Sequence, residues 1–147
     1  MANHSSSHYP DIGQLGEDLV TEYLKSQGWI ILQRRWRCPW GEIDIIAESG
    51  KILVFVEVKT RSSGSWDSGG KLAIATRKQA KLRQTAEIFL AENCEKSDYP
   101  CQFDVAIVHC RPSSRKNLKI QYIHTKLPTL LTEGYELVLQ EYIAAAF

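Results

Sequence analysis

The chain has 147 residues, of which 44% are hydrophobic and 24% are charged, and its formal net charge is +1. These values are ordinary for a soluble globular protein with a single compact domain, and the small net charge does not by itself indicate a nucleic-acid binder. No apolar run is long enough to span a bilayer, and the polar segment 1–10 does not resemble a signal peptide. We therefore expect a cytoplasmic protein, with no membrane partner, whose residues 1–10 form a flexible tail.

The hydrophobic pattern predicts helices and strands in a mixed order. Three helices are expected, over residues 11–27, 76–93 and 129–147. Five strands are expected, over residues 29–33, 42–48, 51–61, 103–108 and 118–124. A basic and aromatic loop is predicted over 34–40, a flexible glycine-rich segment over 64–70, and a polar turn over 111–117 that pairs the last two strands.

This order, αβββαββα, predicts an α/β fold in which a mixed central sheet of about five strands has helices on both faces. Residues 11–127 are expected to form the domain itself. Residues 128–147 are expected to add a helical extension to it.

Charged residues interrupt two strand-like runs that are otherwise apolar. The first run is Gly41-Glu42-Ile43-Asp44-Ile45-Ile46, and the second is Val54-Phe55-Val56-Glu57-Val58-Lys59-Thr60-Arg61. If Ser49 and Gly50 form a two-residue hairpin loop, Glu42 lies opposite Glu57, and Asp44 lies diagonal to Glu57.

The alternation of side chains along a strand then places Glu42, Asp44, Glu57 and Lys59 on one face of the hairpin. The other face is expected to carry Val54, Val56 and Val58 together with Ile43 and Ile45.

A third carboxylate can reach this site from the first helix, where Glu17 lies at the border of the apolar face. Carboxylates gathered in one place repel one another unless a cation lies between them. Glu17, Asp44 and Glu57 are therefore predicted to bind Mg²⁺ or Mn²⁺, with Lys59 beside the ion to hold water or stabilise a transition state. Glu42 is an additional ligand candidate, or an acceptor for the arginines of the 34–37 segment.

Basic residues concentrate around this predicted site, although the net charge is small. Residues 49–86 contain eight lysines and arginines but only Glu57 and Asp67 as acidic residues. Such a surface attracts a polyanion, although a solvated helix face is the simpler explanation for the basic residues of 77–83. Weak candidates for nucleic-acid contact are Arg34, Thr60, Arg61 and Lys78.

The combination of Glu17, Asp44 and Glu57-Val58-Lys59 resembles the restriction-endonuclease-like, or PD-(D/E)XK, superfamily of nucleases. More narrowly, Gly-Glu-Ile-Asp, then Phe-Val-Glu-Val-Lys-Thr-Arg, Lys78 and Phe103-Asp104-Val105 resemble the YraN family of bacterial proteins. The resemblance covers residues 11–124 and implies the restriction-endonuclease-like core. Through similarity to archaeal Holliday-junction resolvases, it also implies Mg²⁺-dependent hydrolysis of DNA phosphodiesters in branched or damaged DNA, and a homodimer by analogy.

Two other functions remain open at this point. The chain can be a nucleic-acid-binding module of the same fold that does not cleave by itself. Alternatively, Asp44, Glu57 and Lys59 can form a buried ion network in a purely structural domain.

Overall fold

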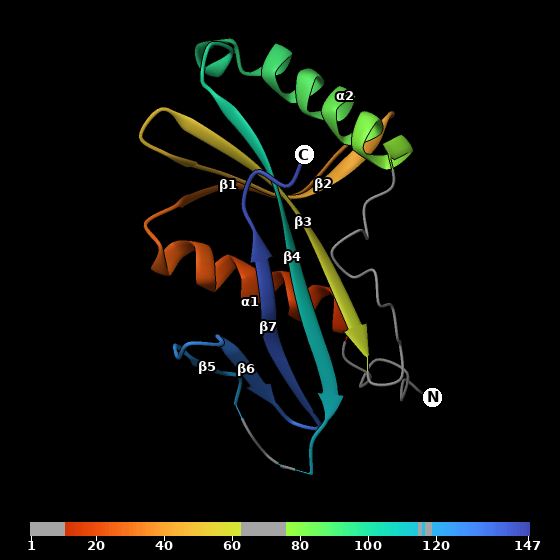
Figure 1. Ribbon diagram of the computed structural model, residues 1–147, viewed down its shortest axis with the longest axis vertical. Helices are drawn as coiled ribbons and strands as arrows, with labels where there is room; N and C mark the ends of the chain where they lie inside the picture. Colours follow the sequence, from red (N-terminus) through yellow and green to blue (C-terminus); the bar gives the residue numbers. More distant parts are fainter. Residues whose placement is uncertain (1–10, 63–75, 115, 117–118) are drawn as a thin grey trace, which may run out of the picture.

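The computed structural model describes residues 11–62, 76–114, 116 and 119–147. The predicted tail at 1–10 and the predicted glycine-rich segment at 64–70 lie outside these residues. The described elements are, in chain order, α1 (Ile12–Ser26), β1 (Ile30–Cys38), β2 (Gly41–Ser49), β3 (Ile52–Ser62), α2 (Thr76–Glu92), η3 (Cys94–Lys96), β4 (Cys101–Pro112), β5 (Gln121–Ile123), β6 (Thr129–Thr132) and β7 (Tyr135–Ile143) (Figure 1).

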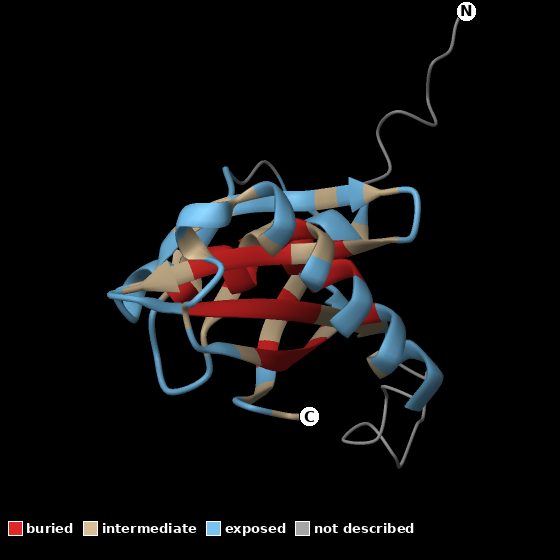
Figure 2. Ribbon diagram, turned by 90° about the horizontal axis from the view of Figure 1, so that it is seen from above, coloured by how far each residue is buried: buried red, intermediate tan, exposed pale blue. Residues whose placement is uncertain are grey.

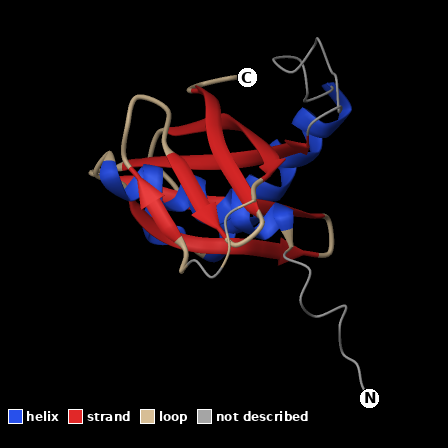
Figure 3. Ribbon diagram, turned by 90° about the horizontal axis from the view of Figure 1, so that it is seen from below, coloured by secondary structure: helices blue, strands red, loops and turns tan. Residues whose placement is uncertain are grey.

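The strands, drawn in red in Figure 3, form one mixed sheet. Their order in the sheet is β1-β2-β3-β4-β7-β6-β5. β3 and β4 are parallel and are joined through α2, whereas the other neighbouring strands are antiparallel. The α/β class and the mixed sheet were therefore predicted correctly. The described part of the chain has seven strands instead of about five.

Two apolar cores lie on opposite faces of the sheet. The core under α1 joins Leu19 and Leu24 to Val54, Val56 and other strand residues. The core under α2 is built from Leu82 and Phe89 with aromatic and aliphatic residues of β2, β3 and β4. Figure 2 shows the buried residues gathered along the central strands, as expected for a sheet that helices cover on both faces. Among the described residues, no helix is long and apolar enough to cross a membrane.

The first helix agrees with the sequence prediction. The side chain of Asp11 accepts a hydrogen bond from the amide of Gln14, which caps the helix at its N-terminus. Gly28 follows the helix with a φ of 93°, a conformation that glycine adopts without strain.

The loop predicted over 34–40 is wrong, because β1 continues to Cys38. Its register shifts between Ile31 and Gln33, and Arg35 has a φ of 53°. β1 is an edge strand, so its arginines can reach solvent or carboxylates while Trp36 packs edge-on against Phe89. The arginines of this segment therefore belong to an edge strand of the sheet and not to a loop.

The C-terminal helix predicted over 129–147 is also wrong, and with it the order αβββαββα and the helical extension over 128–147. β6 and β7 form a hairpin whose turn contains Gly134 with a φ of 88°. Leu137 and Leu139 are both buried, so the apolar residues of this segment repeat every second position, which is the period of a strand. β7 pairs with β4, and β5 pairs with β6 instead of with β4 as predicted.

Asp104 attaches the C-terminal segment to β4. Its carboxylate is 2% exposed and accepts hydrogen bonds from the hydroxyl of Tyr142 at 2.5 Å and from the amide of Ala145 at 2.8 Å. The side-chain amide of Gln102 donates to the same carboxylate at 3.0 Å. A buried charge with several donors is satisfied, so Asp104 has a structural role.

One close contact fixes α1 against β3 near the predicted site. A Cβ atom added at Gly16 would lie 2.0 Å from the Oγ1 atom of Thr60 and 3.3 Å from its Cβ atom. A side chain at residue 16 would displace Thr60 or α1, so glycine at this position allows α1 to lie this close to β3.

We predict that Gly16→Ala lowers the free energy of unfolding by about 1–3 kcal/mol, because the helix must move away from β3. Chemical denaturation measures the change. Gly13→Ala in the same helix is the control and should change stability by less than about 1 kcal/mol, since its added Cβ meets only Asp11 Oδ1 at 3.3 Å. Thr60→Ala should restore part of the loss in a double-mutant cycle, and purely additive effects would contradict the proposed contact.

Candidate metal centre

The β2–β3 hairpin brings the central carboxylates closer together than the sequence predicted. Ser49 pairs with Ile52, so the turn residues are Gly50 and Lys51, and the predicted Ser49–Gly50 loop is wrong. The φ of 60° at Gly50 suits a hairpin turn with glycine at its first central position. The register therefore differs by two residues from the predicted one, which keeps the same faces. The last pair of the ladder is Ile45 with Val56, and Asp44 directly precedes Ile45 while Glu57 directly follows Val56.

The alternation of β2 is interrupted at Asp44. Ile45 packs in the core under α1 together with Val54 and Val56, whereas Ile43 packs in the core under α2. The prediction that Ile43 and Ile45 share a face is therefore wrong. At this point the backbone amide of Val58 in β3 donates a 2.8 Å hydrogen bond to Asp44 Oδ2. A side chain of β2 has taken the place of a backbone acceptor, and this holds the carboxylate against β3.

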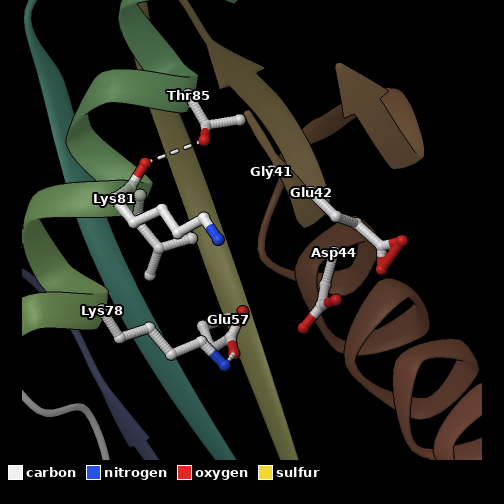
Figure 4. Close-up of a pocket in the computed structure, with 8 residues that line it drawn as sticks. Gly41, Glu42, Asp44, Glu57, Lys78, Lys81 and Thr85 are labelled. Atoms are coloured by element: carbon white, nitrogen blue, oxygen red, sulfur yellow. Dashed lines mark hydrogen bonds and ion pairs between the residues drawn. The ribbon is translucent and has the colours of Figure 1, made fainter. Parts of the chain in front are cut away.

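Glu57 is 8% exposed and lies next to two lysines. Its Oε2 atom is 2.6 Å from Lys78 Nζ of α2 and 3.8 Å from Lys59 Nζ of β3. In Figure 4, Lys78 reaches from α2 toward Glu57, while Asp44 lies on the β2 side of the same space. The predicted neighbourhood of Asp44, Glu57 and Lys59 is thus assembled, with Lys78 as an additional close partner.

The charges at this site affect one another. Burial and the charge of Glu57 raise the pKa of Asp44 to about 7, and the charge of Glu17 adds to this effect. Burial and the charge of Lys78 lower the pKa of Lys59. Although burial opposes it, the hydrogen bond to Glu57 raises the pKa of Lys78. The two carboxylates therefore repel each other, and a cation between them would relieve the repulsion.

Glu17 lies near Asp44 but is paired with arginines. Its Oε1 atom accepts a 2.9 Å hydrogen bond from Arg35 Nε and lies 3.8 Å from Arg34 Nη2. Arg34 also forms a 2.8 Å ion pair with Asp18. Within the described ranges, no three acidic, histidine or cysteine side chains are grouped as metal ligands. The structure thus brings Asp44 and Glu57 together and leaves Glu17 in an ion pair at their side.

Glu42 is paired with the β1 arginines as well, since Arg37 Nε is 2.6 Å from its Oε1 atom. This matches the second of the two roles considered for it. The remaining pair, Asp44 and Glu57, fits a magnesium ion chemically. Mg²⁺ favours hard oxygen donors, and its protein sites commonly contain one or two carboxylates together with water and phosphate oxygens.

A pocket of about 220 Å³ opens beside these carboxylates, and its lining residues are Gly41, Glu42, Asp44, Glu57, Lys78, Lys81, Leu82 and Thr85. Acidic side chains come from the strands, and Lys78 and Lys81 come from α2 (Figure 4). Gly41 allows the close approach of these elements, because an added Cβ would lie 2.6 Å from Thr85 Oγ1.

Lys81 was not among the residues predicted for the site. Its spacing of three residues from Lys78 puts both on one side of a helix, and this was the signal available in the sequence. Of the other predicted contacts, Thr60 has a buried Oγ1 atom without a hydrogen-bond partner in the described part of the chain. Lys59 and Glu17 do not line the pocket itself.

Together these features define an α/β protein whose mixed sheet carries a carboxylate pair facing helix lysines. Residues 16–108 match the family model described as "Uncharacterised protein family UPF0102". A UPF0102 protein of Trichodesmium erythraeum is 46% identical over an alignment of 159 positions, which covers 93% of this chain and 88% of that protein. UPF0102 proteins of Trichormus variabilis and Nostoc sp. are 48% and 49% identical, each over 93% of this chain and 94% of the relative.

The chain therefore belongs to the uncharacterised family UPF0102, which is the YraN-like family indicated by its motifs. The matched segment starts at Gly16 and ends within β4. It includes Asp44, Glu57, Lys59 and both pocket lysines of α2. The hairpin of β6 and β7 lies beyond it.

The raised pKa of Asp44 predicts a pH dependence of stability in a chelating buffer. An aspartate has an ordinary pKa of 3.8, so between pH 3.8 and about 7 the folded protein binds a proton that the unfolded chain has lost. The stabilisation that this proton provides is fully present below pH 3.8 and is lost as the pH rises through about 7.

Asp44→Asn removes this titration while keeping an acceptor for the Val58 amide. Between pH 4 and about pH 7 the wild type loses this stabilisation and the variant does not. We therefore predict that the free energy of unfolding of Asp44→Asn, minus that of wild type, increases by on the order of 1 kcal/mol or more over this range. Urea denaturation at a series of pH values measures the difference. Parallel stability curves for the two proteins would show that Asp44 has an ordinary pKa.

Proposed function

We propose that this protein is a metal-dependent endonuclease of the restriction-endonuclease-like superfamily that hydrolyses DNA phosphodiesters. One observation carries the proposal: Asp44 and Glu57 lie side by side in a pocket whose opposite wall carries lysines. The pair offers hard oxygen ligands for Mg²⁺ or Mn²⁺, and the lysines offer charge for a phosphate. The motif resemblance around Asp44 and Glu57-Val58-Lys59 supports the same assignment.

The order of elements around the site agrees with this proposal. α1 flanks the sheet, the β2–β3 hairpin carries the carboxylates, and α2 leads from β3 to the parallel strand β4. The restriction-endonuclease-like core is thus proposed for α1 through β4, which is nearly the span of the family match.

Each side chain has a role that its position allows. Asp44 and Glu57 would hold the ion, which supplies Lewis-acid activation of water and neutralises negative charge. Lys59, 3.8 Å from Glu57, can donate a hydrogen bond to the phosphoryl oxygens on which negative charge develops in the transition state. Lys78 can hold a phosphate oxygen from the α2 side, and Lys81 adds positive charge to the same wall of the pocket. Arg35 and Arg37 neutralise Glu17 and Glu42, so these carboxylates would not repel a polyanion.

A DNA-binding module without cleavage activity is the second candidate function. It is favoured by the contact of Lys78 with Glu57, because a lysine can satisfy this carboxylate without a metal ion. The same cleavage experiment separates the two candidates.

We predict that the wild-type protein, in Mg²⁺ or Mn²⁺, cleaves at least one substrate among labelled duplex, single-stranded, flapped and four-way DNA. Glu57→Gln and Lys59→Met should each lower the rate by at least about 100-fold, because each removes a group that acts on the transition state. Electrophoresis of end-labelled products measures the rates, and thermal melting confirms that each variant is folded.

Glu48→Gln is the matched control. Glu48 is a glutamate of the same hairpin and pairs with Lys96 at 2.7 Å, outside the pocket. Its removal should leave cleavage unchanged. DNA binding without cleavage in any metal would support the binding module instead. Neither binding nor cleavage, or equal cleavage by wild type and Glu57→Gln, would overturn the endonuclease assignment for this chain alone.

A further inference from the structure

The side chains around Glu57 are balanced in charge before any ion is added. Asp44 and Glu57 carry up to two negative charges, and Lys59 and Lys78 carry two positive ones. Glu42 is neutralised separately by Arg37. A divalent cation placed between Asp44 and Glu57 therefore adds two positive charges that no side chain of the site compensates. Such a site favours either the departure of a lysine or the arrival of an anion.

Of the two lysines, Lys78 is the one placed to leave. Its Nζ atom lies 2.6 Å from Glu57 Oε2, closer than the 3.8 Å of Lys59, so it competes more directly for that oxygen. Its side chain is 45% exposed, compared with 25% for Lys59. A compact ammonium on a flexible four-carbon stem can move without any change in the backbone. The pocket that Lys78 lines leaves room for this movement.

We propose that Lys78 is a built-in counter-ion of Glu57, which a divalent cation displaces and which then binds a phosphate oxygen of the substrate. This inference rests on the proposed function, because it assumes that Asp44 and Glu57 bind the ion. Lys78 thereby sets the affinity for the metal and couples metal binding to phosphodiester binding. In the absence of a phosphodiester the displaced ammonium lacks an anionic partner, so metal binding is weak. With the phosphodiester present, each ligand strengthens the binding of the other.

Lys81 provides a matched control for this role. It lies three residues further along α2 and lines the same pocket, but it has no ion-pair partner among the side chains that the structure describes. Replacing either lysine removes one positive charge from the pocket. Only replacement of Lys78 frees an oxygen of Glu57, so a difference between the two variants reports the direct contact and not the general charge.

The test measures Mn²⁺ binding by isothermal titration calorimetry for wild type, Lys78→Met and Lys81→Met, without DNA. We expect Lys78→Met to lower the dissociation constant for Mn²⁺ about tenfold, because Glu57 then binds the ion without first losing its short ion pair with Lys78. Lys81→Met should change it by less than about threefold. Lys78→Gln, which keeps a polar side chain, should behave like Lys78→Met.

A second titration contains dimethyl phosphate, a stable phosphodiester. It should lower the Mn²⁺ dissociation constant of wild type and of Lys81→Met, but not that of Lys78→Met. Equal Mn²⁺ affinities for wild type and Lys78→Met, or coupling that persists in Lys78→Met, would overturn the role of Lys78 and leave the metal site in place. If no variant binds Mn²⁺, or if Asp44→Asn binds it as well as wild type does, the metal centre itself is wrong and the inference fails with it.

Discussion

The fold around the site depends on the way the β2–β3 hairpin holds Asp44 against Glu57. Two carboxylates at one partly buried point are unfavourable, because each loses water and each repels the other. The amide of Val58 and the ammonium of Lys78 offset part of this cost through hydrogen bonds of 2.8 and 2.6 Å. An arrangement that remains costly for stability is typical of sites kept for function.

The ion pairs of Glu17 and Glu42 distinguish these two carboxylates from Asp44 and Glu57. β1 contributes Arg35 to Glu17 and Arg37 to Glu42, so two of the four carboxylates near the site already have a guanidinium partner. Asp44 and Glu57 face lysines instead, and the ammonium of a lysine, on its flexible stem, exchanges partners more readily than the planar guanidinium of an arginine. Arginines thus hold Glu17 and Glu42, whereas Asp44 and Glu57 are the two carboxylates that we propose as ligands of a cation. Glu17 belongs to the first group, although its charge still acts on Asp44.

The sequence predicted the centre of the molecule better than its edges. Glu57 and Lys59 could be placed on one face because the alternation of β3 is strict, and a register error of two residues did not change that face. The first half of β1 was predicted as a strand over 29–33, but its second half was predicted as a loop, because an edge strand tolerates the arginines that also occur in loops. The C-terminal hairpin was missed because the segment was predicted as a helix, although its apolar residues repeat every second position, as they do in a strand. Neither the break in alternation at Asp44 nor the pairing of Glu17 with Arg35 has a signal in local sequence, since both depend on contacts between distant elements.

The central claim is that Asp44 and Glu57 share one divalent cation. Crystals grown with Mn²⁺ test it most directly, because anomalous scattering locates the ion without assumptions about activity. We expect one strong anomalous peak within coordination distance of both carboxylates, with Lys78 moved away from Glu57. A peak elsewhere in the molecule, or no peak beside these carboxylates at a saturating Mn²⁺ concentration, would contradict it.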